Sequence, residues 1–182
     1  MRVFCARMRR RFVLSVSRLI GIDPGLRHTG WGLVEADGNR LRYLGDGAVD
    51  SDGDLPLAER LRQLHDGLMT VMAHYQPNEA AVEETFVNRN PASTLKLGLA
   101  RGVALLVPAL VGLPVAEYSA NVIKKSVVGT GHADKTQVQA MVKILLPGSC
   151  ARSADSADAL AVAICHAHHR ATRLVWKSGG MS

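Results

Sequence analysis

The sequence predicts an α/β domain built on a mixed sheet with helices packed against it. The first observation behind this prediction is the order of hydrophobic patterns, which runs three strands, helix, strand, helix, strand and then further helices. The second is length, because 182 residues are typical of one domain. The third is a hydrophobic content of 47% with only 4% aromatic residues, which indicates a core of Ala, Val and Leu.

Three strands are expected first. Residues 18–23 and 30–35 predict an antiparallel pair, because an apolar run ends at Asp23 and a Pro-Gly turn follows directly. Residues 41–49 predict a third strand, which an Asp-Gly-Asn turn connects to the second. Asp23 is therefore expected at the end of the first strand, next to the hairpin turn.

After the first three strands, helices and strands alternate along the chain before a final series of helices. Residues 57–75 have apolar side chains at a helical period, and residues 79–83 form a short buried strand that ends in Glu83. A helix from residue 92 to about 111 begins after Pro91, and Pro108 should bend it or end it early. The later elements are a strand at 113–117 and helices at 119–127, 134–146 and 155–170.

Charge is distributed unevenly along the chain. Residues 18–84 hold 6 basic and 12 acidic side chains, whereas residues 85–152 hold 8 basic and 2 acidic ones. A basic middle segment favours a polyanion as partner, because neutralised phosphates release counterions. The three cysteines form no even framework, which favours a reducing compartment, the cytoplasm. The longest apolar run, residues 102–116, is shorter than the roughly 20 residues of a membrane helix, so no membrane is expected.

The first 17 residues carry five arginines and no acid. Three interpretations stay open: a disordered basic extension, a misassigned start with translation beginning at Met8 or later, or a targeting segment. The expected organisation is an extension at 1–17, one α/β domain at 18–172 and a short tail at 173–182.

Four carboxylates come from distant parts of the chain: Asp23, Glu83, Asp155 and Asp158. The three aspartates have structural alternatives, a turn cap for Asp23 and a helix N-cap for Asp155 or Asp158. Glu83 is harder to explain, because an acid beside a buried strand needs a partner or a metal. Hard oxygen ligands without matching His or Cys favour Mg²⁺ or Mn²⁺, and two such ions suit phosphodiester hydrolysis.

Six motifs in order resemble the bacterial Holliday-junction resolvases of the RuvC family, over residues 18–170. They are GIDPG (21–25), TGWG (29–32), VEETF (82–86), LKLGLARG (95–102), VVGTG (127–131) and ADSADALA (154–161).

The resemblance implies an RNase H-like fold, a five-stranded mixed sheet flanked by helices. It implies that Asp23, Glu83, Asp155 and Asp158 bind two Mg²⁺ ions, which Mn²⁺ can replace, and catalyse paired symmetric nicks in four-way junction DNA. The products would be a 5′-phosphate and a 3′-hydroxyl. It also implies a homodimer and the RuvA–RuvB branch-migration complex as partner.

The DNA contacts expected from the resemblance are Phe86, Arg89, Lys124, Lys125 and Lys135. Base stacking suits Phe86, whose alternative is a place in the core. Lys135 begins a helix, where the dipole disfavours a cation unless a phosphate lies nearby.

Two further motifs are rejected. Residues 129–136 nearly match a phosphate-binding loop, but Asp134 replaces the glycine before the lysine. Residues 165–169 hold one cysteine and three histidines, and their spacing spreads them around a helix rather than into one metal site. Two rival functions stay open: a junction-binding protein that does not cut, and an ATP-using enzyme of the actin and sugar-kinase type, which needs a longer chain.

Overall fold

A computed structural model describes residues 16–84, 90–149 and 153–179, the last nine of these for their backbone alone. Five strands form one sheet in the order β3-β2-β1-β4-β5. The first three, β1 (Ser17–Asp23), β2 (His28–Asp37) and β3 (Arg40–Asp50), pair antiparallel. β4 (Glu79–Glu83) and β5 (Val115–Tyr118) add to the β1 edge in parallel. The predicted mixed, five-stranded sheet is confirmed.

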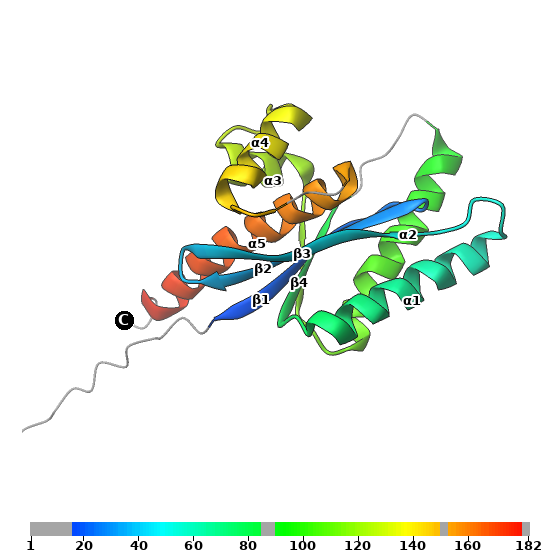
Figure 1. Cartoon of the computed structure of the whole chain (residues 1–182), viewed down its shortest axis with the longest axis horizontal. Helices are drawn as coiled ribbons and strands as arrows, with labels where there is room; N and C mark the ends of the chain where they lie inside the picture. Colours follow the sequence, from blue (N-terminus) through cyan, green and yellow to red (C-terminus); the bar gives the residue numbers. More distant parts are fainter. Residues whose placement is uncertain (1–15, 85–89, 150–152, 180–182) are drawn as a thin grey trace, which may run out of the picture.

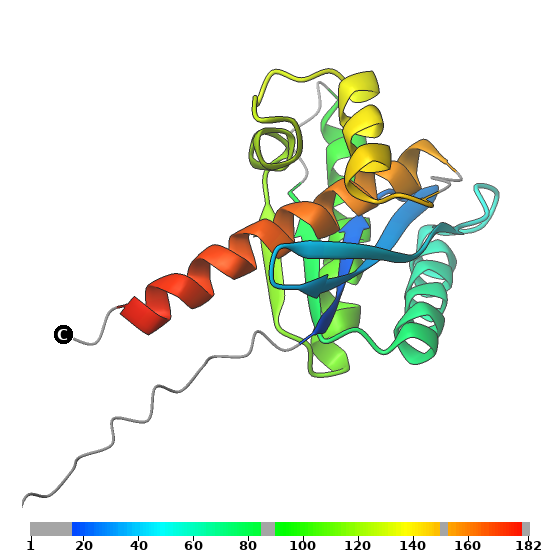
Figure 2. The ribbon, with the colours of Figure 1, turned by 60° about the vertical axis from the view of Figure 1, so that its left-hand side comes forward.

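Five helices cover the two faces of this sheet (Figures 1 and 2). α1 (Leu57–Tyr75) and α2 (Pro91–Leu110) pack against one face. α3 (Ala120–Val128), α4 (Lys135–Leu145) and α5 (Ala154–Gly179) lie on the other. α5 contacts the sheet directly, and α3 and α4 cover it from outside.

Strand alternation divides the core in two, because successive side chains point to opposite faces. In β1, Leu19 packs toward α3, α4 and α5, while Ile20 and Ile22 pack toward α1 and α2. In β4, Ala81 faces the α5 side, and Ala80 and Val82 face the other. By the same alternation, Asp23 and Glu83 at the strand ends lie on the α5 side of the sheet.

Three glycines, Gly21, Gly30 and Gly32, let α5 approach the sheet backbone. A Cβ on Gly21 would lie 2.2 Å from the Ala159 carbonyl oxygen, and one on Gly32 would lie 2.6 Å from the Leu160 nitrogen. Gly21 and Gly32 are cross-strand partners, so they form one flat site beneath the helix. Glycine is required here for close approach.

The observed elements differ from the expected ones mainly at their ends. β2 and β3 extend into polar residues because ladder pairing continues to Asp37 and Arg40. α2 ends at Leu110, two residues after Pro108, and the amide of Leu113 donates to the Pro108 carbonyl. α5 continues from the expected end at residue 170 to Gly179, since no glycine or proline interrupts it earlier.

α2 is, among the described residues, the one helix long and apolar enough to cross a membrane. A single helix of this kind is weak evidence of a membrane span, because core helices of soluble proteins meet the same criterion of length and composition.

Candidate active site

Asp23 ends β1 on the α5 side of the sheet, immediately before the Pro24–Gly25 turn. Its expected alternative role was to cap that turn. The Thr29 hydroxyl performs this role instead, donating to the Gly25 carbonyl at 2.7 Å and accepting from the Gly25 amide at 3.4 Å. The Asp23 carboxylate is therefore not needed to hold the turn.

Glu83 ends β4, the parallel neighbour of β1. Ile22 pairs with Val82 in register, so the residues that follow them, Asp23 and Glu83, emerge at the same edge of the sheet. The ladder continues past Glu83, because the Glu84 amide donates to the Tyr118 carbonyl at 2.9 Å. Backbone pairing thus holds Glu83 in place from the β5 side.

Asp155 and Asp158 lie in the first turns of α5. Here too the structural alternative, an N-cap role, belongs to another residue: Ser153 Oγ accepts from the Ser156 amide, and Ser156 Oγ accepts from the Ser153 amide, both at 3.1 Å. Asp155 lies against Gly30, where an added Cβ would be 2.2 Å from its carbonyl oxygen. Because Gly30 pairs with Asp23, this contact brings the start of α5 beside Asp23.

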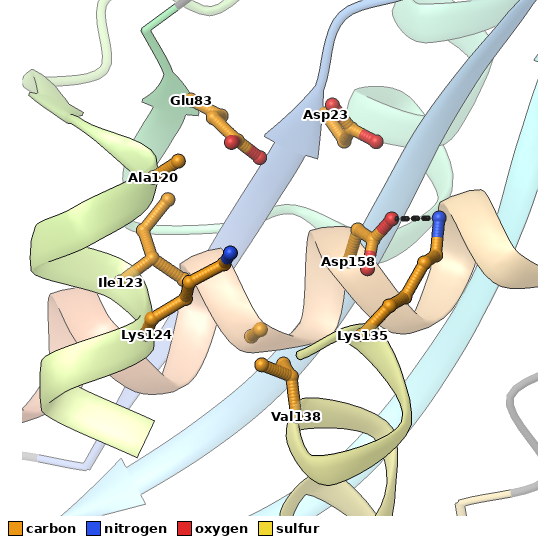
Figure 3. A pocket seen from close by; sticks show the side chains of 9 residues that line it. Asp23, Glu83, Ala120, Ile123, Lys124, Lys135, Val138 and Asp158 are labelled. Atoms are coloured by element: carbon orange, nitrogen blue, oxygen red, sulfur yellow. Dashed lines mark ion pairs between the residues drawn. The ribbon is translucent and has the colours of Figure 1, made fainter. Parts of the chain in front are cut away.

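A pocket of about 320 Å³ opens between these elements (Figure 3). Three of the four predicted acids line it, each from a different element: Asp23 from β1, Glu83 from β4 and Asp158 from α5. Lys124 and Lys135 complete the polar lining of the pocket. The apolar wall consists of Ala120, Ile123, Val138 and Ala161. Asp155 does not line this pocket, but it is near enough for its charge to act on Asp23.

The surroundings of the pocket disfavour the ionised forms of two of its acids, Asp23 and Glu83. Burial, followed by the charges of Glu83, Asp158 and Asp155, raises the pKa of Asp23 from 3.8 to about 8. Burial, followed by the charge of Asp158, raises the pKa of Glu83 from 4.5 to about 7. Lys135 opposes both shifts. Such displaced pKa values are typical of functional sites.

The donor set fits a hard divalent cation. All four acids offer oxygen ligands, and a cation would offset the burial and the charge repulsion that raise the pKa of Asp23. As the side chains stand, no three Asp, Glu, His or Cys groups in the described part of the chain converge closely enough to hold one ion. The acids surround the pocket from three elements, so binding requires their side chains to close around the cation.

The predicted DNA contacts divide into three groups. Lys124 and Lys135 line the pocket, and the Lys135 ammonium lies 2.7 Å from Asp158 Oδ2. This ion pair, rather than a phosphate alone, accounts for a lysine in the first turn of α4. Lys125 is an exposed residue of α3 that does not line the pocket, while Phe86 and Arg89 lie outside the described residues.

Both rejected motifs have structural roles. Asp134 forms a capping box with Gln137 at the start of α4, which explains the acid in the apparent phosphate loop. Of the group at 165–169, Cys165 is buried, and His166 bonds to Tyr118 and Glu79.

The features that position the acids were not predicted from the sequence. Gly21, Gly30 and Gly32 set the depth of α5, and Thr29 closes the turn after Asp23. Alternating glycines in a predicted strand are a detectable signal, since they indicate close approach of another backbone.

A five-stranded mixed sheet with acids at the ends of two parallel neighbours and at the start of the helix above them defines the RNase H-like class. The family described as "Crossover junction endodeoxyribonuclease RuvC" matches residues 19–166, and the chain belongs to this RuvC family. The family prediction is thereby confirmed, and with it the prediction of an endonuclease that depends on a divalent metal.

Similar proteins support this assignment. The crossover junction endodeoxyribonuclease RuvC of Gluconacetobacter diazotrophicus is 65% identical over 89% of this chain and 96% of its own length. That of Paramagnetospirillum magneticum is 67% identical over 86% and 94%. A solved structure of Thermus thermophilus RuvC in complex with a Holliday junction substrate has a TM-score of 0.80 at 33% identity, covering 86% of this chain and 96% of that one.

Proposed function

We propose that this chain resolves four-way (Holliday) DNA junctions by paired symmetric nicks, in homologous recombination and DNA repair. The observation that carries the proposal is the convergence of Asp23, Glu83 and Asp158, from three distant segments, on one pocket that two lysines flank. A junction-binding protein that does not cut has no need for these half-buried acids, because burial and nearby negative charge disfavour the ionised forms of Asp23 and Glu83.

In this proposal the four acids, Asp23, Glu83, Asp155 and Asp158, hold two Mg²⁺ ions, which Mn²⁺ can replace. The bound ions supply Lewis-acid stabilisation for in-line hydrolysis of a phosphodiester, leaving a 5′-phosphate and a 3′-hydroxyl. Asp23 has the central place, because it lies beside both Glu83 on β4 and the start of α5. The apolar wall of the pocket limits water around the acids and strengthens their interaction with a cation.

The basic side chains would hold the DNA backbone. Lys124 and Lys135 would contact the phosphates next to the scissile bond, and their position in the pocket with the acids supports this role. Lys125 and Arg89 would extend the contact, and Phe86 would stack on bases at the junction. Backbone contacts position DNA without reading its sequence, so specificity for junctions would come from geometry.

We also propose a homodimer, because a two-fold protein matches the symmetry of a four-way junction. α2 offers a suitable surface. Its exposed apolar side chains recur at one helical face, at Leu95, Leu99, Leu106 and Leu110. The same face would explain why α2 is apolar enough to resemble a membrane helix. In the cell we expect action in the cytoplasm together with the RuvA–RuvB branch-migration complex.

A mobile four-way junction with labelled arms tests the proposal. With Mg²⁺, the protein should place symmetric nicks in two opposing strands, and the nicked product should be sealed by a ligase. Asp23→Asn should abolish nicking while leaving junction affinity intact. Asp66→Asn, the same chemical change at an exposed position of α1, should cut like the natural protein. Binding without nicking in both Mg²⁺ and Mn²⁺ would favour a binding protein instead.

A further inference from the structure

A network of polar side chains joins α5 to the starts of β1 and β4 and to Tyr118 at the end of β5. His166 Nε2 lies 3.1 Å from Glu79 Oε2, and its Nδ1 lies 3.0 Å from the Tyr118 hydroxyl. Arg170 donates from Nε to Glu79 Oε1 at 2.5 Å and from Nη2 to Ser17 Oγ at 2.8 Å. His166, Tyr118 and Ser17 are buried, so these bonds are made away from bulk water.

Each element that carries a predicted catalytic acid also carries a member of this network at a distance from that acid. β1 runs from Ser17 to Asp23, and β4 runs from Glu79 to Glu83. α5 holds Asp158 near its start and His166 two turns later. Along β4, Glu79 and Glu83 are four residues apart, which corresponds to about 13 Å. Along α5, Asp158 and His166 are eight residues apart, which corresponds to about 12 Å. The distance from acid to network is therefore similar in these two elements.

The network also reaches the strand that supports Glu83 from the side. Tyr118 pairs with Glu83 in the ladder, and its carbonyl accepts from the Glu84 amide. Its ring stacks on His169 of α5, with centroids 5.2 Å apart. A movement of α5 relative to β5 would therefore change both the hydroxyl bond to His166 and the ring contact.

Packing and hydrogen bonds hold α5 on the sheet in different ways. Near the pocket, α5 contacts the flat site of Gly21 and Gly32 through Ala159, Leu160, Val162 and Ala163. Leu160, Val162 and Ile164 are fully buried, so packing fixes the distance between helix and sheet. The directional hydrogen bonds of the network add resistance to sliding and rotation, because they weaken steeply when their geometry changes.

We infer that the Glu79–His166–Tyr118 network is a positioning device for the metal site, holding Asp155 and Asp158 on α5 in register with Asp23 and Glu83 on the sheet. None of these three residues contacts metal or DNA in this account; they act through the elements that carry the acids. The inference rests on the proposed function, since it assigns the network to the same acidic pocket.

The test measures binding of Mn²⁺ alone to the full chain, from the signal of free Mn²⁺ in electron paramagnetic resonance. Tyr118→Phe should weaken binding about three- to tenfold, the range expected for coupling between linked sites. The metal concentration for half-maximal nicking should rise by the same factor, with little change in the rate at saturating metal. Junction affinity in EDTA should not change. Glu79→Gln should act in the same direction and provides the comparison if Tyr118→Phe does not fold.

Tyr43→Phe is the matched control. It removes another tyrosine hydroxyl, which bonds to Asp46 on β3, a strand without a predicted catalytic acid. It should leave Mn²⁺ affinity unchanged even where it lowers the melting temperature. If Tyr118→Phe lowers the melting temperature but binds Mn²⁺ within twofold of the natural protein, the network only stabilises the fold and the inference is wrong. If the acidic pocket is not the metal site, Asp23→Asn should bind Mn²⁺ as tightly as the natural protein. That result would contradict the proposed function and is distinct from failure of the positioning role.

Discussion

The ammonium group of Lys135, in the first turn of α4, lies 2.7 Å from the carboxylate of Asp158, near the start of α5. This ion pair crosses one side of the acidic pocket (Figure 3). The side-chain hydrogen bond to Asp158 raises the pKa of Lys135, so the lysine stays charged. It compensates the acids only in part, because the pKa values of Asp23 and Glu83 remain raised.

The first prediction concerns pH. In the folded chain Asp23 titrates at about 8 rather than 3.8, so the folded state holds a proton that the unfolded state has released. Stability without metal should therefore fall as pH rises between about 4 and about 8. We expect melting temperatures in EDTA to decline over this range more steeply for the natural protein than for Asp23→Asn.

Added Mg²⁺ should counter this decline, because the carboxylates must lose their protons to bind it. The stabilisation by Mg²⁺ should be larger at pH 8 than at pH 6. Equal declines in the natural protein and Asp23→Asn would show that the pKa of Asp23 is not raised in the folded chain.

The second prediction concerns DNA binding. Lys124→Met should weaken junction binding and reduce the salt dependence of the affinity by about one unit of slope, as for the loss of one phosphate contact. Lys143→Met removes an exposed lysine of α4 that does not line the pocket, and it should change neither quantity. Fluorescence anisotropy at several salt concentrations measures both. Identical effects of the two substitutions would indicate a general charge effect.

The third prediction concerns the close contact between α5 and Gly32 of the sheet. Gly32→Ala places a methyl group 2.6 Å from the Leu160 nitrogen, so the helix or strand must move. We expect a loss of about 1–3 kcal/mol in the free energy of unfolding, the usual cost of overpacking. Gly53→Ala, where nothing lies within 4 Å, should stay within about 0.5 kcal/mol. Urea denaturation measures both, and equal stabilities would mean that α5 does not rest on Gly32.

The fourth prediction concerns the dimer. Leu99→Glu should weaken self-association by about 2 kcal/mol or more, because it buries a charge at the apolar face of α2. Ile144→Glu is the matched control, since Ile144 is an exposed apolar residue of α4. Sedimentation velocity over a range of concentrations compares them. A dimer that tolerates Leu99→Glu and not Ile144→Glu would place the interface on α4.

Much of the fold follows from local pattern. The apolar period of α1 and the alternation in β1 and β2 identify these elements and their type, because each buries one face. Element ends were less certain. β2 and β3 extend through polar residues that pair with each other, and this pairing depends on a partner strand rather than on hydrophobicity.

The acids were identifiable because a carboxylate at the end of a buried strand is costly without a partner. Their local alternatives could not be excluded from sequence, since Asp23 and Asp155 are also good capping residues. The structure resolves this point by assigning the turn to Thr29 and the helix cap to Ser153. The metal-binding and catalytic roles of the acids remain predictions for the experiments above.

The sequence by itself determined the order of strands and helices, the type of sheet and the four acids, since these follow from hydrophobic period and from residue chemistry near in the chain. Only the tertiary structure decided which acids share a pocket, that Lys135 pairs with Asp158, and how α5 rests on Gly21 and Gly32. These relationships join residues far apart in sequence, and they depend on strand register and helix position, which no local pattern records.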